Sequence, residues 1–204
     1  MAANNTNIST YHLSANPALY EPSRSNTFQF LLTGLANSAT MDQILAAGKN
    51  INTATSTDFL GSTKNMQEVI MLSVAEASVP HFDLNTIEIR RGNSTMKFAG
   101  TPTFGDGSLR LNDYVGARTK DLLMAWQALA YDVGDDVVHL ADNYKYDCEL
   151  VEYAPDFSRI VRKWTLIGCW AKTVSEGNFS HESPDKRIID VTIVYDRAIP
   201  EVVQ

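Results

Sequence analysis

The chain has 204 residues, of which 44% are hydrophobic and 20% are charged, so global disorder is excluded and one sizeable core is allowed. Seventeen Lys and Arg against 24 Asp and Glu give a formal net charge of −7. This charge argues against a protein that wraps nucleic acid, because Lys and Arg supply most of the affinity for phosphate. No apolar run approaches the ~20 residues of a membrane span, and the first ten residues do not resemble a secretory signal. We therefore expect a protein that is made and kept in a cytoplasm.

The N-terminal third contains two polar segments around one expected strand. Residues 1–25 are rich in Asn, Ser, Thr and Pro, and we expect a flexible arm that becomes ordered against a neighbour. In TFQFLLTGLA, every second residue is a large apolar one, which indicates a strand with these side chains on one face: Phe28, Phe30 and Leu32. Residues 37–65 are predicted to be a long polar loop insertion, with a candidate short helix in MDQILAAGKN.

Two further strands and a hairpin are expected next. QEVIMLSVAEASVP predicts a strand that ends at Pro80, with Ile70 and Leu72 on one face. NTIEIRRGNSTMKFAG predicts a hairpin with its turn at Gly92 and Asn93. TPTFGDGSLRL adds a short strand after a glycine-rich turn.

One long helix is expected over residues 116–132. Its apolar residues recur at helical spacing, with Gly134 just past the end. The residues of this stripe are Leu122, Leu123, Trp126, Leu129 and Ala130. An acidic stretch, DVGDDVVHLADN, follows and is interpreted as a solvated loop, since it lacks the ligand spacing of a calcium-binding loop.

The last part of the chain predicts a second hairpin and a closing strand. YKYDCELVEY and RIVRKWTLIGCW form the hairpin, with Trp164, Leu166 and Trp170 expected on one face. In RIIDVTIVYDRAIP, apolar residues alternate with polar ones, which indicates a strand with one face on a core and the other in water. Proline 200 is expected to end this strand. The domain thus comprises residues 26–200, and residues 201–204 form a C-terminal tail.

The chain carries almost no signal of enzymatic chemistry. Cys148 and Cys169 stand outside any CxxC pair and are expected to be buried thiols, and the four histidines are scattered singly. Phosphate-binding glycine motifs and nucleophile elbows are absent from the sequence. We therefore predict no enzyme, no catalytic or metal site and no cofactor. The tryptophans are expected to form core, with Trp126 packing over Trp164 or Trp170, although a stacking platform for bases or sugars is the alternative.

The order of these pieces resembles a known family. ASVP after a buried strand, the FAG return strand, the helical Trp126, the strand from Trp164 to Trp170 and the closing VTIVYDRA together resemble the tail tube proteins of contractile-tailed bacteriophages. These are relatives of the tube protein of type VI secretion systems. The resemblance covers residues 27–200, while residues 37–65 look longer and more polar than the family's usual loop.

The resemblance implies a mainly β fold, namely a small β-barrel or sandwich with one main flanking helix. Six copies would form a ring with a continuous inner β-barrel, and stacked rings would form the tail tube of a virion. Viral DNA would pass through the lumen without specific binding. The implied partners are copies of the chain itself and the sheath, baseplate and tail terminator proteins, with assembly in the host cytoplasm and no insertion into a membrane.

Three alternatives remain open from the residues alone. One is the tube of a type VI secretion system or another contractile injection system, and one is a monomeric β-barrel that binds carbohydrate or single-stranded nucleic acid. The third is a small hydrolase with unrecognised chemistry. If the chain lines a tube, the candidate lumen-facing residues are Asp147, Glu149 and Asp190, because each alternates with residues expected to be buried. Such carboxylates would repel a passing polyanion.

Overall fold

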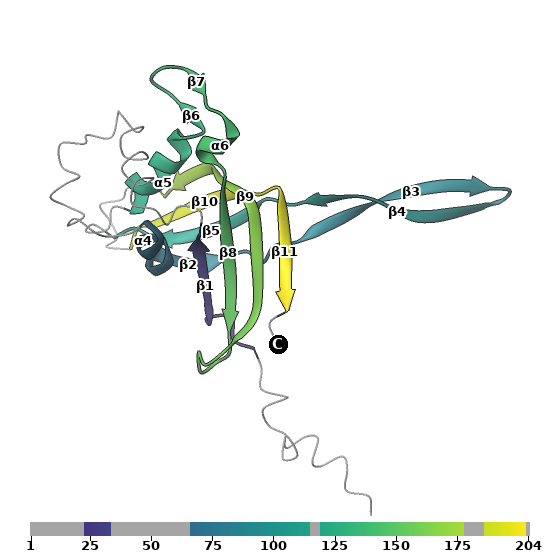
Figure 1. The fold of residues 1–204 in the computed structure, drawn as a ribbon, viewed down its shortest axis with the longest axis horizontal. Coiled ribbons are helices and arrows are strands. Elements are labelled where there is room, and N and C mark those ends of the chain that lie inside the picture. The colour runs from purple at the N-terminus through teal and green to yellow at the C-terminus, as the bar shows by residue number, and fades with distance from the viewer. Residues whose placement is uncertain (1–22, 34–65, 115–118, 178–185, 203–204) are drawn as a thin grey trace, which may run out of the picture.

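The structure is a computed structural model that describes residues 23–33, 66–114, 119–177 and 186–202 (Figure 1). Nearly all of the expected arm, the whole 37–65 insertion with its candidate helix, and the end of the C-terminal tail lie outside the described residues.

A bent antiparallel sheet of seven strands forms the body (Figure 1). Its strands follow the order β1, β8, β9, β10, β5, β2, and β11 pairs with β9 off this path. Their bounds are β1 Phe28–Leu32, β2 Val74–Ala77, β5 Gly107–Asn112, β8 Tyr146–Tyr153, β9 Ile160–Glu176, β10 Ile188–Val194 and β11 Arg197–Val202. The strand β9 belongs to two layers, since its first part pairs with β8 and β11 and its last part pairs with β10.

We call the layer of β1, β8, β11 and the first part of β9 sheet A, and the layer of β2, β5, β10 and residues 170–176 sheet B. Alternate residues of both sheets point into a common core, as the period of two predicts. In β10, for example, Ile189, Val191 and Ile193 are buried, whereas Asp190 is exposed. The end strands β1 and β2 are not hydrogen-bonded to each other, so the barrel stays open in one chain.

Helices cover one end of this core. The helix α5 (Thr119–Ala128) packs on β9, and four residues of the predicted stripe are buried: Leu122, Leu123, Trp126 and Leu129. The predicted end at residue 132 was wrong, because the helix ends at Ala128, Ala130 is only partly buried, and residues 131–132 form a strand. The short helix α6 (Ala141–Tyr144) follows the acidic stretch, and the Trp126 Nε1 donates a hydrogen bond to the Tyr144 carbonyl oxygen at 3.3 Å.

One expected strand is a helix instead. Residues Met66–Ser73 form α4, and β2 begins at Val74. Val69, Ile70 and Ser73 are buried at helical spacing, whereas Leu72 is 63% exposed. The prediction was wrong because the four consecutive residues 69–72 are apolar, so alternation could not distinguish strand from helix there.

Two hairpins project from the body. One is formed by β3 (Phe82–Arg91) and β4 (Ser94–Phe104), with the predicted turn at Gly92 and Asn93, and is far longer than its neighbours (Figure 1). The other consists of β6 (Tyr131–Asp132), at the end of the predicted helix, and β7 (Val137–Val138), in the stretch that was interpreted as a loop.

The second predicted hairpin, β8 and β9, is confirmed, but one face assignment in β9 is wrong. Leu166 is buried as expected, yet the following buried residues are Cys169 and Ala171, while Trp170 is partly exposed. The register shifts opposite this point, and Gly168 adopts a φ of +67°, so a β-bulge reverses the alternation.

The tryptophans are core residues to different degrees. Trp126 is 1% exposed, and Trp164 packs against the same core. Trp170 instead meets the ring of Tyr144 edge to face at 5.6 Å. The closing run also differs from the prediction, because it splits into β10 and β11 around Asp196 and continues through Pro200, which lies in β11 beside β9.

Candidate assembly surfaces

The middle of the outer face of sheet B is polar, while the partly buried Ile188 and Val194 lie on the same face at the two ends of β10. The polar side chains alternate with the core residues of the four strands: Glu76, Ser108, Arg110, Thr173, Ser175, Asp190 and Thr192. Four of these seven are hydroxyl residues, and the other three, Glu76, Arg110 and Asp190, are charged. This part of the surface therefore consists of hydroxyl groups and one charged cluster.

That cluster joins three strands. The Arg110 Nε donates a hydrogen bond to Asp190 Oδ1 at 2.9 Å, and its Nη1 lies 3.3 Å from Glu76 Oε2. The hydrogen bond to Asp190, followed by the charge of Glu76, raises the pKa of the Arg110 guanidinium. Arg110 is therefore flanked by two carboxylates, and the cluster keeps an excess of one negative charge.

The outer face of sheet A holds the other two predicted residues. Glu149 forms an ion pair with Lys163 at 3.0 Å, and this contact raises the pKa of the Lys163 ammonium. Asp147 is exposed, and its Oδ1 accepts a hydrogen bond from the Gly168 N–H at 3.1 Å. The structure thus places Asp147 and Glu149 together on β8, and Asp190 on the other sheet.

Sheet B ends in two unpaired backbone edges. Among the described strands, β2 pairs with β5 alone, and residues 170–176 of β9 pair with β10 alone. Free edges of this kind are templates for pairing with another chain. Because the two edges lie on opposite sides of the same sheet, copies can pair head to tail.

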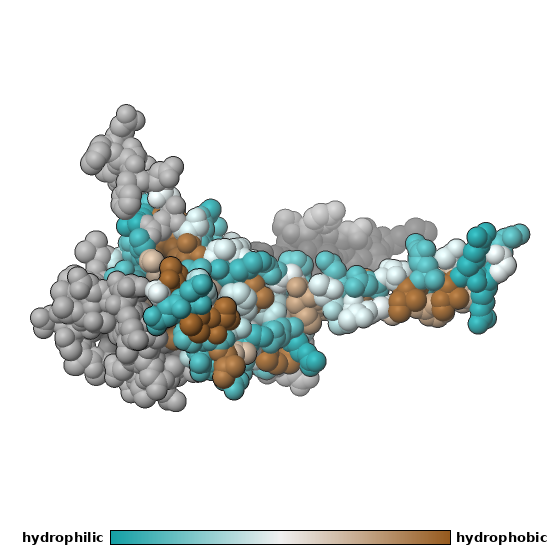
Figure 2. Space-filling model, turned by 90° about the horizontal axis from the view of Figure 1, so that it is seen from above, coloured by the Kyte–Doolittle hydropathy of each residue, from teal (hydrophilic) through white to brown (hydrophobic). Residues whose placement is uncertain are grey.

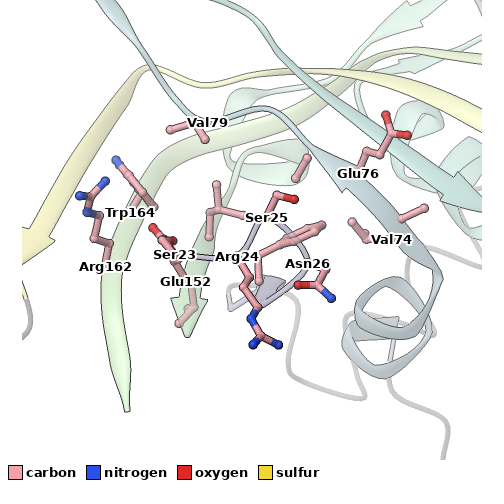
Figure 3. Close-up of a pocket in the computed structure, with 15 residues that line it drawn as sticks. Ser23, Arg24, Ser25, Asn26, Val74, Glu76, Val79, Glu152, Arg162 and Trp164 are labelled. Carbon is pink, nitrogen blue, oxygen red and sulfur yellow. The ribbon is translucent and has the colours of Figure 1, made fainter. Parts of the chain in front are cut away.

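The gap between the ends of the open barrel forms a pocket of about 760 Å³ (Figure 3). Val74, Val79 and Trp164 line it, with Arg24 and Arg162 beside them. At its edge the Ser23 hydroxyl donates a hydrogen bond to Glu152. Its lining is a mixture of apolar and charged side chains.

The β3–β4 hairpin carries an exposed apolar face. Two cross-strand pairs, Ile87 with Phe98 and Ile89 with Met96, share one side of the ribbon, and each side chain is 46–53% exposed. Figure 2 shows this apolar group near the far end of the projection, flanked by hydrophilic side chains. The opposite side holds the ion pair between Lys97 and Glu88 at 3.2 Å. A single chain leaves this amphipathic ribbon without a surface to cover it.

No group of three or more His, Cys, Asp or Glu that could hold a metal ion occurs in the described part of the chain. Among those same residues, no helix is long and apolar enough to cross a membrane. Cys148 and Cys169 are both fully buried, as expected. Burial, and then the hydrogen bond to the Cys169 thiol, raise the pKa of Cys148 well above its ordinary value, so this thiol is a poor nucleophile.

Neither family models nor curated proteins match the chain, but solved structures do. It is similar to a chain of the anti-feeding prophage cap, described as the tube terminating cap, with a TM-score of 0.61, 15% identity, and coverage of 93% of this chain and 97% of that one. It is also similar to a chain of the sheath-tube complex of an extracellular contractile injection system, with a TM-score of 0.56, 15% identity, and coverage of 96% and 99%. A chain of the anti-feeding prophage baseplate gives a TM-score of 0.57 at 12% identity over 90% and 98% of the two chains.

These likenesses establish the fold. The mainly β architecture with few helices, predicted from the resemblance to tube proteins, is confirmed. Sequence reasoning missed two features of the surface, namely the exposure of the β3–β4 apolar face and the apolar residues within the acidic stretch. The alternation of Ile87 and Ile89 predicts an apolar face on this strand. The sequence does not show whether that face packs on the core or remains exposed on a projecting hairpin.

Proposed function

We propose that this chain is a structural subunit of a hollow tube in a contractile, phage-tail-like assembly. The observation that carries the proposal is sheet B, a four-stranded layer with a polar outer face and two free edges. Pairing β2 of one copy with the end of β9 in the next continues the sheet, and closure of the ring removes both edges. The wall of the lumen is then the outer face of sheet B.

The fold likeness supports this proposal. The similar chains come from structures described as a tube terminating cap, a sheath-tube complex and a baseplate solved with 6-fold symmetry. We infer rings of six copies that stack into a tube, with sheath, baseplate and terminator proteins as partners. A monomeric binding module would leave both sheet edges and the apolar face of the hairpin in water.

In this arrangement Asp190 faces the lumen beside Arg110 and Glu76. Asp147 and Glu149 belong to sheet A, so they face the lumen only in the alternative arrangement in which sheet A lines the channel. Both assignments are proposals, and they depend on which of the two sheets faces the inside of the ring. The polar wall of sheet B, rich in hydroxyl groups, favours the first.

The material that passes through the tube defines two versions of the function. A wall with no unpaired cation suits the passage of DNA, because a polyanion is held mainly by free Lys and Arg; this version is the tail tube of a virion. The likeness to an extracellular contractile injection system favours a second version, in which the tube serves an injection device that does not deliver a genome. Sequencing of nuclease-protected DNA from purified particles distinguishes them.

Negative-stain microscopy of the purified chain tests self-assembly directly. We expect rings or tubes of uniform diameter at high concentration. A chain that stays strictly monomeric at every concentration, in the presence and absence of its sheath partner, would contradict the proposal.

A further inference from the structure

Two projections at different ends of the molecule have complementary surfaces. We call residues 86–99 of the β3–β4 hairpin the hairpin tip, and residues 131–142, which include β6 and β7, the knob. Both expose large apolar side chains, and they carry opposite charge.

The hairpin tip is basic around its apolar face. It contains Arg90, Arg91 and Lys97 against a single acid, Glu88, which is paired with Lys97. In the ladder, the pair of Arg91 and Ser94 follows that of Ile89 and Met96 by two residues, so Arg91 shares the apolar side and borders it at the turn. This surface would match an apolar partner that is bordered by carboxylates.

The knob has that composition. Val133, Val138 and Leu140 are 73–78% exposed. Around them stand four aspartates, Asp132, Asp135, Asp136 and Asp142, and the range contains no lysine or arginine.

The knob is also ordered internally, which holds these apolar groups outward. The Asp132 Oδ1 accepts a hydrogen bond from the Gly134 N–H at 2.8 Å, and the Tyr131 hydroxyl donates one to Asp136 Oδ1 at 2.5 Å. The latter bond, then burial and the charge of Asp132, raise the pKa of the Tyr131 hydroxyl. A surface already fixed in shape loses little conformational entropy on binding.

The two surfaces cannot meet within one chain. Figure 1 shows the hairpin tip at the far end of a long projection, while β6 and β7 lie on the opposite part of the body, above α5 and α6. Any contact between them is therefore intermolecular. Because two different surfaces would be joined, the contact is heterologous and repeats from copy to copy, as a ring or a stack requires.

We propose that the hairpin tip of one copy binds the knob of a second copy. The apolar side of the tip covers the exposed valines and leucine of the knob, and Arg91, which borders that side, lies among the aspartates of the knob. This inference rests on the proposed self-assembly and adds which two surfaces make one of its contacts. Opposite charge fixes the register, since a tip-to-tip or knob-to-knob contact would place like charges together.

Charge reversal tests the pairing. In one variant Arg90 and Arg91 are changed to Glu, and in a second Asp135 and Asp136 are changed to Lys. Each alone is expected to raise the protein concentration needed for sedimentable assemblies by about tenfold or more, because like charges then face each other. A mixture of the two variants is expected to assemble again, because copies that alternate place opposite charges at every junction, and the chain that carries all four changes is expected to assemble by itself.

The matched control is Arg159→Glu in the turn between β8 and β9, which is exposed and lies far from both surfaces. It is expected to assemble like the unchanged chain. Circular dichroism checks that every variant is folded. If the unchanged chain assembles and the single reversals have no effect, or the combined variant stays defective, the pairing is wrong while the tube function stands. If the unchanged chain never assembles, the tube function itself fails.

Crosslinking gives an independent readout. A tagged copy with Met96→Cys is mixed with an untagged copy with Val138→Cys and oxidised mildly, and a disulfide between the two kinds of copy is expected. The native cysteines are buried and do not compete. Met124→Cys on α5, also exposed at 44%, replaces the knob cysteine as control and should give no tagged–untagged product. Products that join Met96→Cys copies to one another, or no product at all, would overturn the proposal.

Discussion

Gly168 sets the geometry of the longest strand. Residues with a side chain rarely adopt its backbone φ of +67°, and a Cβ added there would lie 2.5 Å from Asp196 Oδ2. The bulge turns Cys169 into the core and Trp170 toward Tyr144, so one residue redirects both neighbours.

Replacement of Gly168 by Ala is therefore expected to lower the free energy of unfolding by about 1–3 kcal/mol, through backbone strain and the close approach of Asp196. Urea denaturation measures the change. Gly177→Ala is the matched control, because Gly177 has no atom within 4 Å of an added Cβ. Equal stability of the two variants would show that the bulge does not depend on glycine.

The buried thiol pair gives a pH dependence. Because burial raises the pKa of Cys148, the folded state keeps its proton at a pH where the unfolded chain has lost it. Its contribution is fully present below roughly pH 8.5 and is lost as the pH rises above that value. We expect the free energy of unfolding to fall from pH 8 to pH 10 and to fall less in Cys148→Ala. An identical pH profile for both proteins would contradict this account.

At the scale of elements, alternation predicted most strands well. It predicted β1, β5, β8 and β10, because in each of them most buried residues alternate with less buried ones. It failed at α4, where both faces of the imagined strand were apolar, and it could not place the β3–β4 hairpin outside the core. Projection depends on where the flanking strands β2 and β5 are held in sheet B, which is a tertiary property.

The exposed face of the hairpin allows function and stability to be separated. Ile87→Ser combined with Phe98→Ser is expected to change the free energy of unfolding by less than about 1 kcal/mol, since both side chains are roughly half exposed in the monomer. The same variant should fail to form sedimentable assemblies. Calorimetry and sedimentation measure the two effects.

The control for that variant is Leu166→Ala in the core, which is expected to cost about 2–5 kcal/mol in stability. If the hairpin variant proves as destabilised as this one, the hairpin packs on its own chain and is not an assembly surface.

At the scale of the whole molecule, the candidate lumen residues show what a sequence can supply. The alternation in β8 and β10 predicted that Asp147, Glu149 and Asp190 leave the core. It could not tell that they lie on two different sheets, because that depends on how β9 passes from sheet A to sheet B at its bulge. Nor did it pair Asp190 with Arg110, which is 80 residues away in the chain.

That pairing gives a prediction for the assembled tube. Glu76→Gln with Asp190→Asn leaves Arg110 without its two carboxylates and creates a ring of free cations in the proposed lumen. Assembled tubes of this variant are expected to retain fluorescent single-stranded DNA at low salt and to release it as salt rises. Asp147→Asn, on sheet A, is the control and should retain none. Equal retention by both variants would place the Arg110 cluster outside the lumen.

In the proposed tube, sheet B continues from copy to copy and lines a channel. Cryo-electron microscopy of tubes assembled from the purified chain tests it most directly. We expect rings in which β2 of each copy is hydrogen-bonded to residues 170–176 of its neighbour, with Ser108, Thr173 and Asp190 facing the lumen. Tubes in which these side chains lie on the outer wall, or in which β2 remains unpaired on its free edge, would contradict it.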